Sequence, residues 1–149
     1  MATTNSGRKE NVSTGGFAPR LGGEGTRAKR VLLVDDHDLF REVLAVIFKQ
    51  YTDLDDDVQA GSIAEARQVL RGRNSNGLAL AVVDLDLADG GGIELIGELR
   101  RAGIRVLALT ANRRSEQLAR ASRAAPDEVL TTAASCDEIL DAVMRLVGG

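Results

Sequence analysis

Three aspartates and a threonine directly follow short apolar runs of the chain. Asp35 and Asp36 follow the first run, Asp84 a later one and Thr110 the next. If the runs are parallel strands, their carboxyl ends meet at one edge of a sheet, where ligands bind. Crowded carboxylates repel one another unless a cation neutralises them, and hard oxygen ligands suit Mg²⁺. A carboxylate beside Mg²⁺ can attack a phosphoryl group and form an acyl phosphate. The spacing therefore predicts a site for Mg²⁺-dependent phosphoryl chemistry, with the Thr110 hydroxyl as a hydrogen-bond donor.

Short apolar runs alternate with amphipathic segments from residue 31 onward. Strands are expected at 31–34, 58–60, 78–83, 106–109 and 129–130. Helices are expected at 39–48, 62–70, 93–99, 115–124 and 135–147. All-apolar strands are typical of sheets covered on both faces. Strict alternation predicts an α/β fold, a doubly wound five-stranded parallel sheet with helices on both faces.

Two Ser-x-x-Glu sequences refine the helix starts. Ser62 to Glu65 and Ser135 to Glu138 each predict a capping box, in which serine and glutamate side chains bond the first free amides of a helix. The fourth helix is poor in large apolar residues, so we expect it to be the most loosely held.

Composition favours a globular cytoplasmic protein. The chain has 149 residues, 44% hydrophobic and 28% charged, enough for one domain with a core. The aromatic share of 3%, without Trp, argues against stacking of nucleic-acid bases. The one cysteine, Cys136, excludes an internal disulfide and fits a reducing compartment. No apolar run is long enough to cross a bilayer, so no membrane contact is expected.

Residues 1–29 differ from the rest of the chain. They show no periodicity and are rich in Gly, Ser and Thr, so they cannot bury enough surface to offset ordering entropy. We expect a disordered basic leader, followed by a single domain over 30–149. The chain carries a net charge of -3 although this leader is basic, so the domain itself is acidic. With no helix-turn-helix segment after it, direct DNA binding is not expected.

Three segments resemble the receiver domains of bacterial response regulators, especially those with helix-turn-helix outputs. Val31–Arg41 is similar to the opening of the family, Asp84–Leu95 to its phosphoacceptor segment and Leu107–Ala111 to its switch-threonine segment. The resemblance covers about residues 30–147, with the motifs in the family's order. His37, the only histidine, is interpreted as a loop residue of the opening segment.

The resemblance implies a flavodoxin-like sheet of order 2-1-3-4-5 and a site with assigned roles. Asp84 would be the phosphoacceptor and Thr110 the switch residue. Mg²⁺ would be held by Asp36, Asp84 and the backbone carbonyl of Asp86, with Asp35 assisting through water. The expected partners are a sensor histidine kinase or phosphotransfer protein and a downstream protein effector. Output, or a homodimer, is expected on the face of the fourth helix, fifth strand and fifth helix.

The chain departs from the family pattern at three positions. Thr132 stands where the family has a lysine that pairs with the phosphoryl group, and Val129 replaces the usual switch aromatic. Ala88 replaces a proline. A short hydroxyl cannot supply the charge of an ammonium group. We therefore expect phosphorylation to be weakly coupled to conformation, with Arg113 or Arg114 as candidate substitutes.

Other functions stay open. The first alternative is a degenerate pseudo-receiver that binds a partner independently of phosphorylation. Asp84-Leu85-Asp86 also resembles the nucleophile motif of haloacid-dehalogenase-type phosphatases, with Asp86 as general acid. That family has the opposite motif order and needs a downstream lysine, so a signalling protein rather than an enzyme is favoured. A nucleotide-binding protein is disfavoured because Asp35 and Asp36 would repel phosphate in the first loop.

Overall fold

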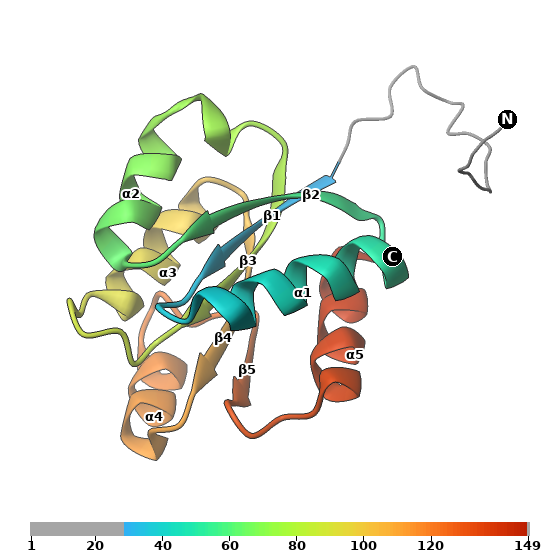
Figure 1. Cartoon of the computed structure of the whole chain (residues 1–149). Coiled ribbons are helices and arrows are strands. Elements are labelled where there is room, and N and C mark those ends of the chain that lie inside the picture. The colour runs from blue at the N-terminus through green and yellow to red at the C-terminus, as the bar shows by residue number, and fades with distance from the viewer. Residues whose placement is uncertain (1–28, 149) are drawn as a thin grey trace, which may run out of the picture.

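A parallel sheet of five strands forms the centre of the computed structural model, which describes residues 29–148 (Figure 1). The strands are β1 (Lys29–Val34), β2 (Leu54–Ala60), β3 (Leu78–Asp84), β4 (Arg105–Thr110) and β5 (Glu128–Thr131). Their order, β2-β1-β3-β4-β5, confirms the expected topology. The predicted leader lies outside the described residues except for Lys29, which already belongs to β1.

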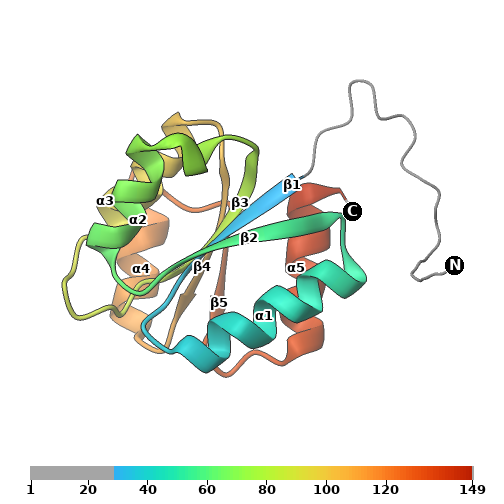
Figure 2. The same cartoon turned by 45° about the horizontal axis from the view of Figure 1, so that its top comes forward.

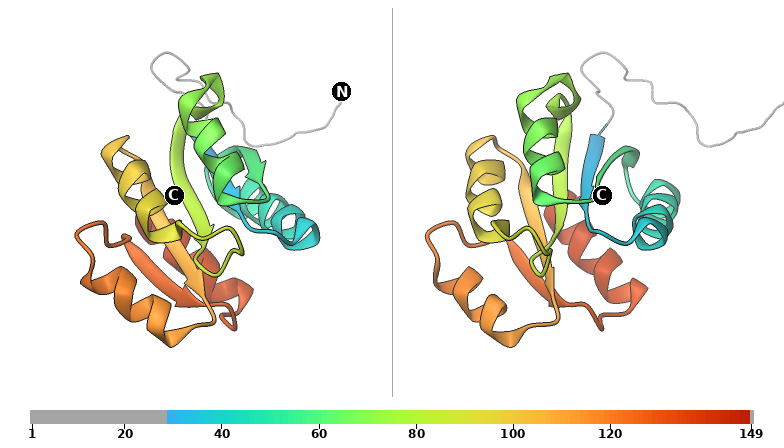
Figure 3. Two further views of the ribbon diagram at one scale, coloured as in Figure 1. Left: turned by 90° about the vertical axis from the view of Figure 1, so that its left-hand side faces the viewer. Right: turned by 60° about the vertical axis from the view of Figure 1, so that its left-hand side comes forward.

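Five α-helices cover the two faces of this sheet (Figures 1 and 2). They are α1 (Asp38–Tyr51), α2 (Ile63–Arg71), α3 (Gly92–Arg101), α4 (Arg113–Ala121) and α5 (Cys136–Val147), with a short 3₁₀ turn, η1, at Arg73–Ser75. Helices α1 and α5 lie on one face, and α2, α3 and α4 lie side by side on the other (Figure 3). None of the helices between residues 29 and 148 is both long and apolar enough to span a membrane.

The central strands are apolar throughout because each face contacts a separate core. Along β1, Val31 and Leu33 pack with α1 and α5, whereas Leu32 and Val34 pack with α2 and α3. All four side chains are fully buried. The same alternation in β3 and β4 explains why neither strand shows a polar face in the sequence.

Strand β2 is longer than predicted, because its first half is acidic and does not show in the apolar pattern of the sequence. Only residues 58–60 were expected, but the strand begins at Leu54 and includes Asp55 to Asp57. An edge strand has one open side, so its side chains need not be apolar. Arg30 Nε on β1 donates to Asp56 Oδ2 at 2.7 Å and offsets one of these charges.

One predicted capping box is confirmed and the other is only half right. Ser135 Oγ accepts from Glu138 N at 3.1 Å, and Glu138 Oε1 accepts from Ser135 N at 2.8 Å. At α2, Ser62 Oγ accepts from Glu65 N at 3.1 Å, as expected. The Glu65 carboxylate instead bonds Gly61 N at 2.6 Å.

Helix α4 is weakly anchored, as its sequence indicates. It begins earlier than predicted, at Arg113, because the Asn112 side chain accepts from Arg114 N at 2.9 Å and caps it. Ala119 is the one buried residue of the helix, and Leu118 is 54% exposed. With little apolar surface to lose, α4 can shift at low cost.

Candidate functional site

Asp35, Asp84 and Thr110 lie at the carboxyl edge of the sheet, and each is buried. Their exposed fractions are 8%, 8% and 3%, and they are the buried polar residues among 29–148. Burying carboxylates costs free energy unless the groups are paired or neutralised. The three come from the ends of β1, β3 and β4, so the sheet brings together residues that are far apart in sequence.

The loop after β1 adds Asp36 and His37 to this edge. Asp35 Oδ1 accepts from His37 N at 2.8 Å, and His37 Nδ1 lies 2.9 Å from Asp35 Oδ1 and 3.0 Å from Asp36 Oδ1. The pKa of His37 is raised, first by the hydrogen bond to Asp35 and then by the charge on Asp36. The three side chains offer potential metal-ligating atoms within 4.8 Å of one another. The sequence interpretation of His37 as a loop residue did not foresee its contact with the acidic pair.

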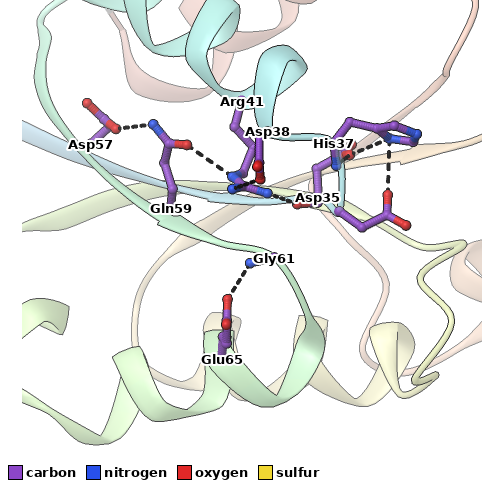
Figure 4. Close-up of polar contacts among 9 residues, drawn as sticks. Asp35, His37, Asp38, Arg41, Asp57, Gln59, Gly61 and Glu65 are labelled. Atoms are coloured by element: carbon purple, nitrogen blue, oxygen red, sulfur yellow. Dashed lines mark hydrogen bonds and ion pairs between the residues drawn. The ribbon is translucent and has the colours of Figure 1, made fainter.

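Arg41 holds this loop in place (Figure 4). From α1, its Nη1 donates to the carbonyl oxygen of Asp35, and its Nη2 donates to Asp38 Oδ1 at 2.5 Å. Its Nε donates to Gln59 Oε1 on β2 at 3.0 Å, and Gln59 Nε2 in turn donates to Asp57 Oδ2 at 2.9 Å. One guanidinium thus joins α1, the end of β1 and the edge strand. Arg41 belongs to the Val31–Arg41 segment that resembles the family's opening, but the sequence alone indicated no role for it.

We predict that Arg41→Lys destabilises the protein by about 1.5–3 kcal/mol and weakens Mg²⁺ binding. An ammonium group cannot make three divergent hydrogen bonds in the fixed plane of a guanidinium, and bonds to charged groups contribute about that much. Urea unfolding and Mg²⁺ titration would measure the two effects. Arg105→Lys, at an exposed position, is the matched control. Equal stability of the Arg41 and Arg105 variants would contradict the prediction.

Asp84 is oriented by the loop that follows it. Its Oδ1 accepts from Asp86 N at 2.8 Å. The pKa of Asp84 is raised, mainly by burial; the Asp86 N–H bond lowers it, and the charges on Asp35, Asp86 and Asp36 raise it further. A carboxylate in these surroundings is stabilised by a cation. The oxygen-rich donor set fits Mg²⁺, which prefers carboxylate and carbonyl oxygens and keeps several waters.

The side chain of Asp86 contacts the end of β4 and the residue that follows it, which was not foreseen. Thr110 Oγ1 donates to Asp86, with distances of 2.9 Å to Oδ1 and 3.1 Å to Oδ2. Ala111 N donates to Asp86 Oδ2 at 2.7 Å. Asn112 N donates to Thr110 Oγ1 at 2.9 Å, which further orients the hydroxyl. The sequence indicated a metal ligand in the backbone carbonyl of Asp86, and a general acid in its side chain under the phosphatase alternative, but no contact with Thr110.

Asp89 ties the loop after β3 to the start of α2. Its two carboxylate oxygens accept from Ile63 N at 3.2 Å and Ala64 N at 3.1 Å. The loop then turns through Gly90 and Gly91, with φ values of +69° and +86°, which disfavour other residues. These contacts position the loop that follows Asp84 even though Ala88 replaces the family's proline.

Of the positions that depart from the family pattern, Thr132 lies beside Thr110, whereas Val129 pairs with Ala108, two residues earlier on β4. Thr132 is exposed, and its N–H donates to the carbonyl oxygen of Thr110 at 3.2 Å. Val129 is buried in the core shared with α3. Arg113 and Arg114 are exposed. Within residues 29–148, no hydrogen bond or ion pair joins a lysine or arginine side chain to the side chains of Asp84, Asp86 or Thr110.

The parallel sheet and the carboxylate edge define the class of protein. Residues 31–144 match the family model described as response regulator receiver domain. The chain therefore belongs to the response regulator receiver domain family, the phosphoacceptor modules of two-component systems. Members are generally non-enzymatic signalling domains that interact with histidine kinases and effector domains.

Solved structures and a curated relative agree with this family. A CheY-like receiver domain protein from Methanospirillum hungatei superposes with a TM-score of 0.67 at 19% identity, covering 82% of this chain and 95% of that one. TrrA of Thermotoga maritima, solved in complex with Mg²⁺-BeF, gives a TM-score of 0.61 at 26% identity, covering 79% and 98%.

The curated relative is the DNA-binding transcriptional activator DevR/DosR of Mycobacterium tuberculosis. It is 39% identical over 83 residues, which cover 54% of this chain and 37% of the relative. The match thus spans little more than a third of that protein's length.

Proposed function

We propose that Asp84 accepts a phosphoryl group from a sensor histidine kinase or phosphotransfer protein in an Mg²⁺-dependent step. The observation that carries the proposal is the burial of Asp35, Asp84 and Thr110 together at the carboxyl edge of the sheet. Unneutralised carboxylates at such a position are costly, so their presence together favours a functional role.

Asp36, Asp84 and the backbone carbonyl of Asp86 would hold Mg²⁺, with Asp35 assisting through water. When bound, the ion supplies positive charge that offsets the acidic groups and the incoming phosphoryl oxygens. The complex of TrrA with Mg²⁺-BeF supports this assignment by analogy. The Asp36 side chain is 53% exposed, so it is accessible from solvent.

The residues of the chain itself orient the acceptor. Since Asp84 Oδ1 is engaged by Asp86 N, we assign Oδ2 as the attacking oxygen. Its O–P bond forms as the N–P bond of the donor phosphohistidine breaks, and the imidazole leaves with the electron pair. The Thr110 hydroxyl is the donor we assign to the transferred group.

We propose no phosphatase activity for this site. A general acid must be free to protonate the leaving group. In the unphosphorylated protein the Asp86 carboxylate is instead engaged by Thr110 and Ala111. No lysine follows Lys49 in the sequence, although haloacid-dehalogenase-type phosphatases need one downstream of the nucleophile. The pseudo-receiver alternative is likewise not favoured, because the acceptor and the acidic pair are intact.

Signalling is proposed to run through protein contacts on the face formed by α4, β5 and α5, with an effector or a second copy as partner. Helix α4 has a single buried residue, so it can shift at low cost, and it carries the exposed Leu118. Exposed apolar groups alone do not select this face, because α1 carries more of them. We do not propose direct DNA contact by residues 29–148. The relay we propose is cytoplasmic.

Intact-protein mass spectrometry tests the phosphoacceptor proposal. Wild type incubated with acetyl phosphate and Mg²⁺ is expected to gain one phosphoryl mass, and excess EDTA should prevent the gain. Asp84→Asn should gain none, whereas Asp141→Asn, an exposed substitution on α5, should behave as wild type. A gain that persists in Asp84→Asn, or no gain in wild type with several phosphodonors, would overturn the proposal.

A further inference from the structure

The Asp86 carboxylate contacts the donor that we assign to the phosphoryl group, the Thr110 hydroxyl, and also the backbone N–H of the next residue, Ala111. Thr110 Oγ1 and Ala111 N both donate to it, with a shortest distance of 2.7 Å. We propose that Asp86 acts as an internal anion that holds the switch segment, Thr110 to Asn112, in the unphosphorylated protein, and that a phosphoryl group on Asp84 must displace it. This inference rests on the proposed function of Asp84 as acceptor.

The position of Asp86 allows it to act in this way. It lies two residues after Asp84, and its own N–H donates to Asp84 Oδ1 at 2.8 Å. The backbone of Asp86 therefore fixes the acceptor while its side chain reaches the end of β4. One residue links the phosphorylation site to the switch segment before any phosphate is present.

A carboxylate is chemically suited to take the place of a phosphoryl group here. Both present anionic oxygens that accept hydrogen bonds from hydroxyl and amide donors. Thr132 stands in place of the family's lysine. The Thr110 hydroxyl and the Ala111 amide are therefore the remaining donors that we can assign to the phosphoryl oxygens. Because the Asp86 carboxylate already occupies these donors, the phosphoryl group gains less free energy by binding them. The like charges of the two groups also repel each other.

The contact can be broken, because Asp86 is exposed. A displaced carboxylate would enter water rather than remain buried without a partner, so displacement carries little desolvation cost. Thr110, in contrast, is buried, and the carbonyl oxygen of Asn112, at 3.2 Å, would be its remaining neutral acceptor, so its hydroxyl would favour a new anionic acceptor. The phosphoryl oxygens would provide one.

The first test uses the unphosphorylated protein without Mg²⁺. In Asp86→Ala, amide hydrogen exchange at Ala111 should become at least about tenfold faster than in wild type, since its acceptor is removed. Asp86→Asn, which keeps one acceptor oxygen, should give an intermediate rate. Glu94→Ala removes an exposed carboxylate from the start of α3 and should leave exchange at Ala111 unchanged. Wild-type exchange at Ala111 in Asp86→Ala would overturn the proposal.

The second test measures competition with a phosphoryl mimic. Asp86→Ala keeps the backbone carbonyl, so with Mg²⁺ present it should bind beryllofluoride at least about tenfold more tightly than wild type, followed by ¹⁹F NMR. Equal or weaker binding would overturn the displacement proposal even if Ala111 exchange had changed. If neither wild type nor Asp86→Ala bound beryllofluoride or gained phosphoryl mass, the function proposed for Asp84 would fail. The exchange rate at Ala111 alone would then decide whether Asp86 holds the switch segment.

Discussion

The Asp84→Asn variant should unfold roughly 3–5 °C above wild type at pH 7 in metal-free buffer, although it accepts no phosphoryl group. Asp84 is buried beside the charges of Asp35, Asp36 and Asp86, and both conditions raise its pKa. An amide has nearly the same shape and no charge, so the substitution relieves repulsion on the order of 1 kcal/mol. For a domain of this size, that corresponds to several degrees. Differential scanning calorimetry would measure the shift.

The pH dependence follows from the direction of the shift. Because the folded-state pKa of Asp84 lies above its unfolded value, protonation of this group favours the folded state. That contribution is fully present below the unfolded pKa and is lost as pH rises through the folded pKa. The difference in unfolding temperature between Asp84→Asn and wild type should therefore be small in acid. It should grow as pH rises from the unfolded to the folded pKa of Asp84, and then level off.

Mg²⁺ should reduce the same difference by stabilising wild type more than Asp84→Asn. Asp141→Asn removes an exposed charge from α5, and we expect it to change stability by less than about 0.5 kcal/mol. A difference between Asp84→Asn and wild type that depends on neither pH nor Mg²⁺ would show that the acidic cluster is not electrostatically strained.

Thr132→Lys should strengthen the coupling between phosphorylation and conformation by about tenfold or more. Thr132 N donates to the carbonyl oxygen of Thr110, so a longer side chain at this position begins next to the switch residue. A charged hydrogen bond to the phosphoryl group would add on the order of 1.5–3 kcal/mol to the difference between the two states. NMR shifts through α4 and β5 should be small on phosphorylation of wild type and larger in the variant.

Two further proteins distinguish this effect from a general effect of added charge. Thr131→Lys places the same charge one residue earlier, at the exposed end of β5, and should not increase the response. Combining Thr132→Lys with Asp86→Ala separates pairing with the phosphoryl group from pairing with Asp86. If wild type already showed shifts throughout α4 and β5, unchanged by Thr132→Lys, the missing lysine would not limit switching. Arg113 and Arg114 would then become the first candidates for the cation.

Features that depend on neighbours in sequence could be predicted from the sequence alone. The apolar runs identified β1, β3 and β4 because strands buried on both faces need apolar side chains at every position. The Ser135 capping box was predictable because both partners lie within one helical turn. The gathering of Asp35, Asp84 and Thr110 at one edge was also predictable, since the carboxyl ends of parallel strands meet at the same edge of a sheet.

Only the tertiary structure showed which side chains hold this edge together. The Arg41 contact with Gln59 joins α1 to an edge strand whose acidic start hid it from the apolar pattern. The bonds from Thr110 and Ala111 to Asp86 join loops about 25 residues apart. Side-chain direction and donor pairing depend on how strands are placed beside one another, and residue order does not encode that locally. The physical reason is that hydrogen bonds are short and directional, so they are decided by where the completed sheet places each donor and acceptor.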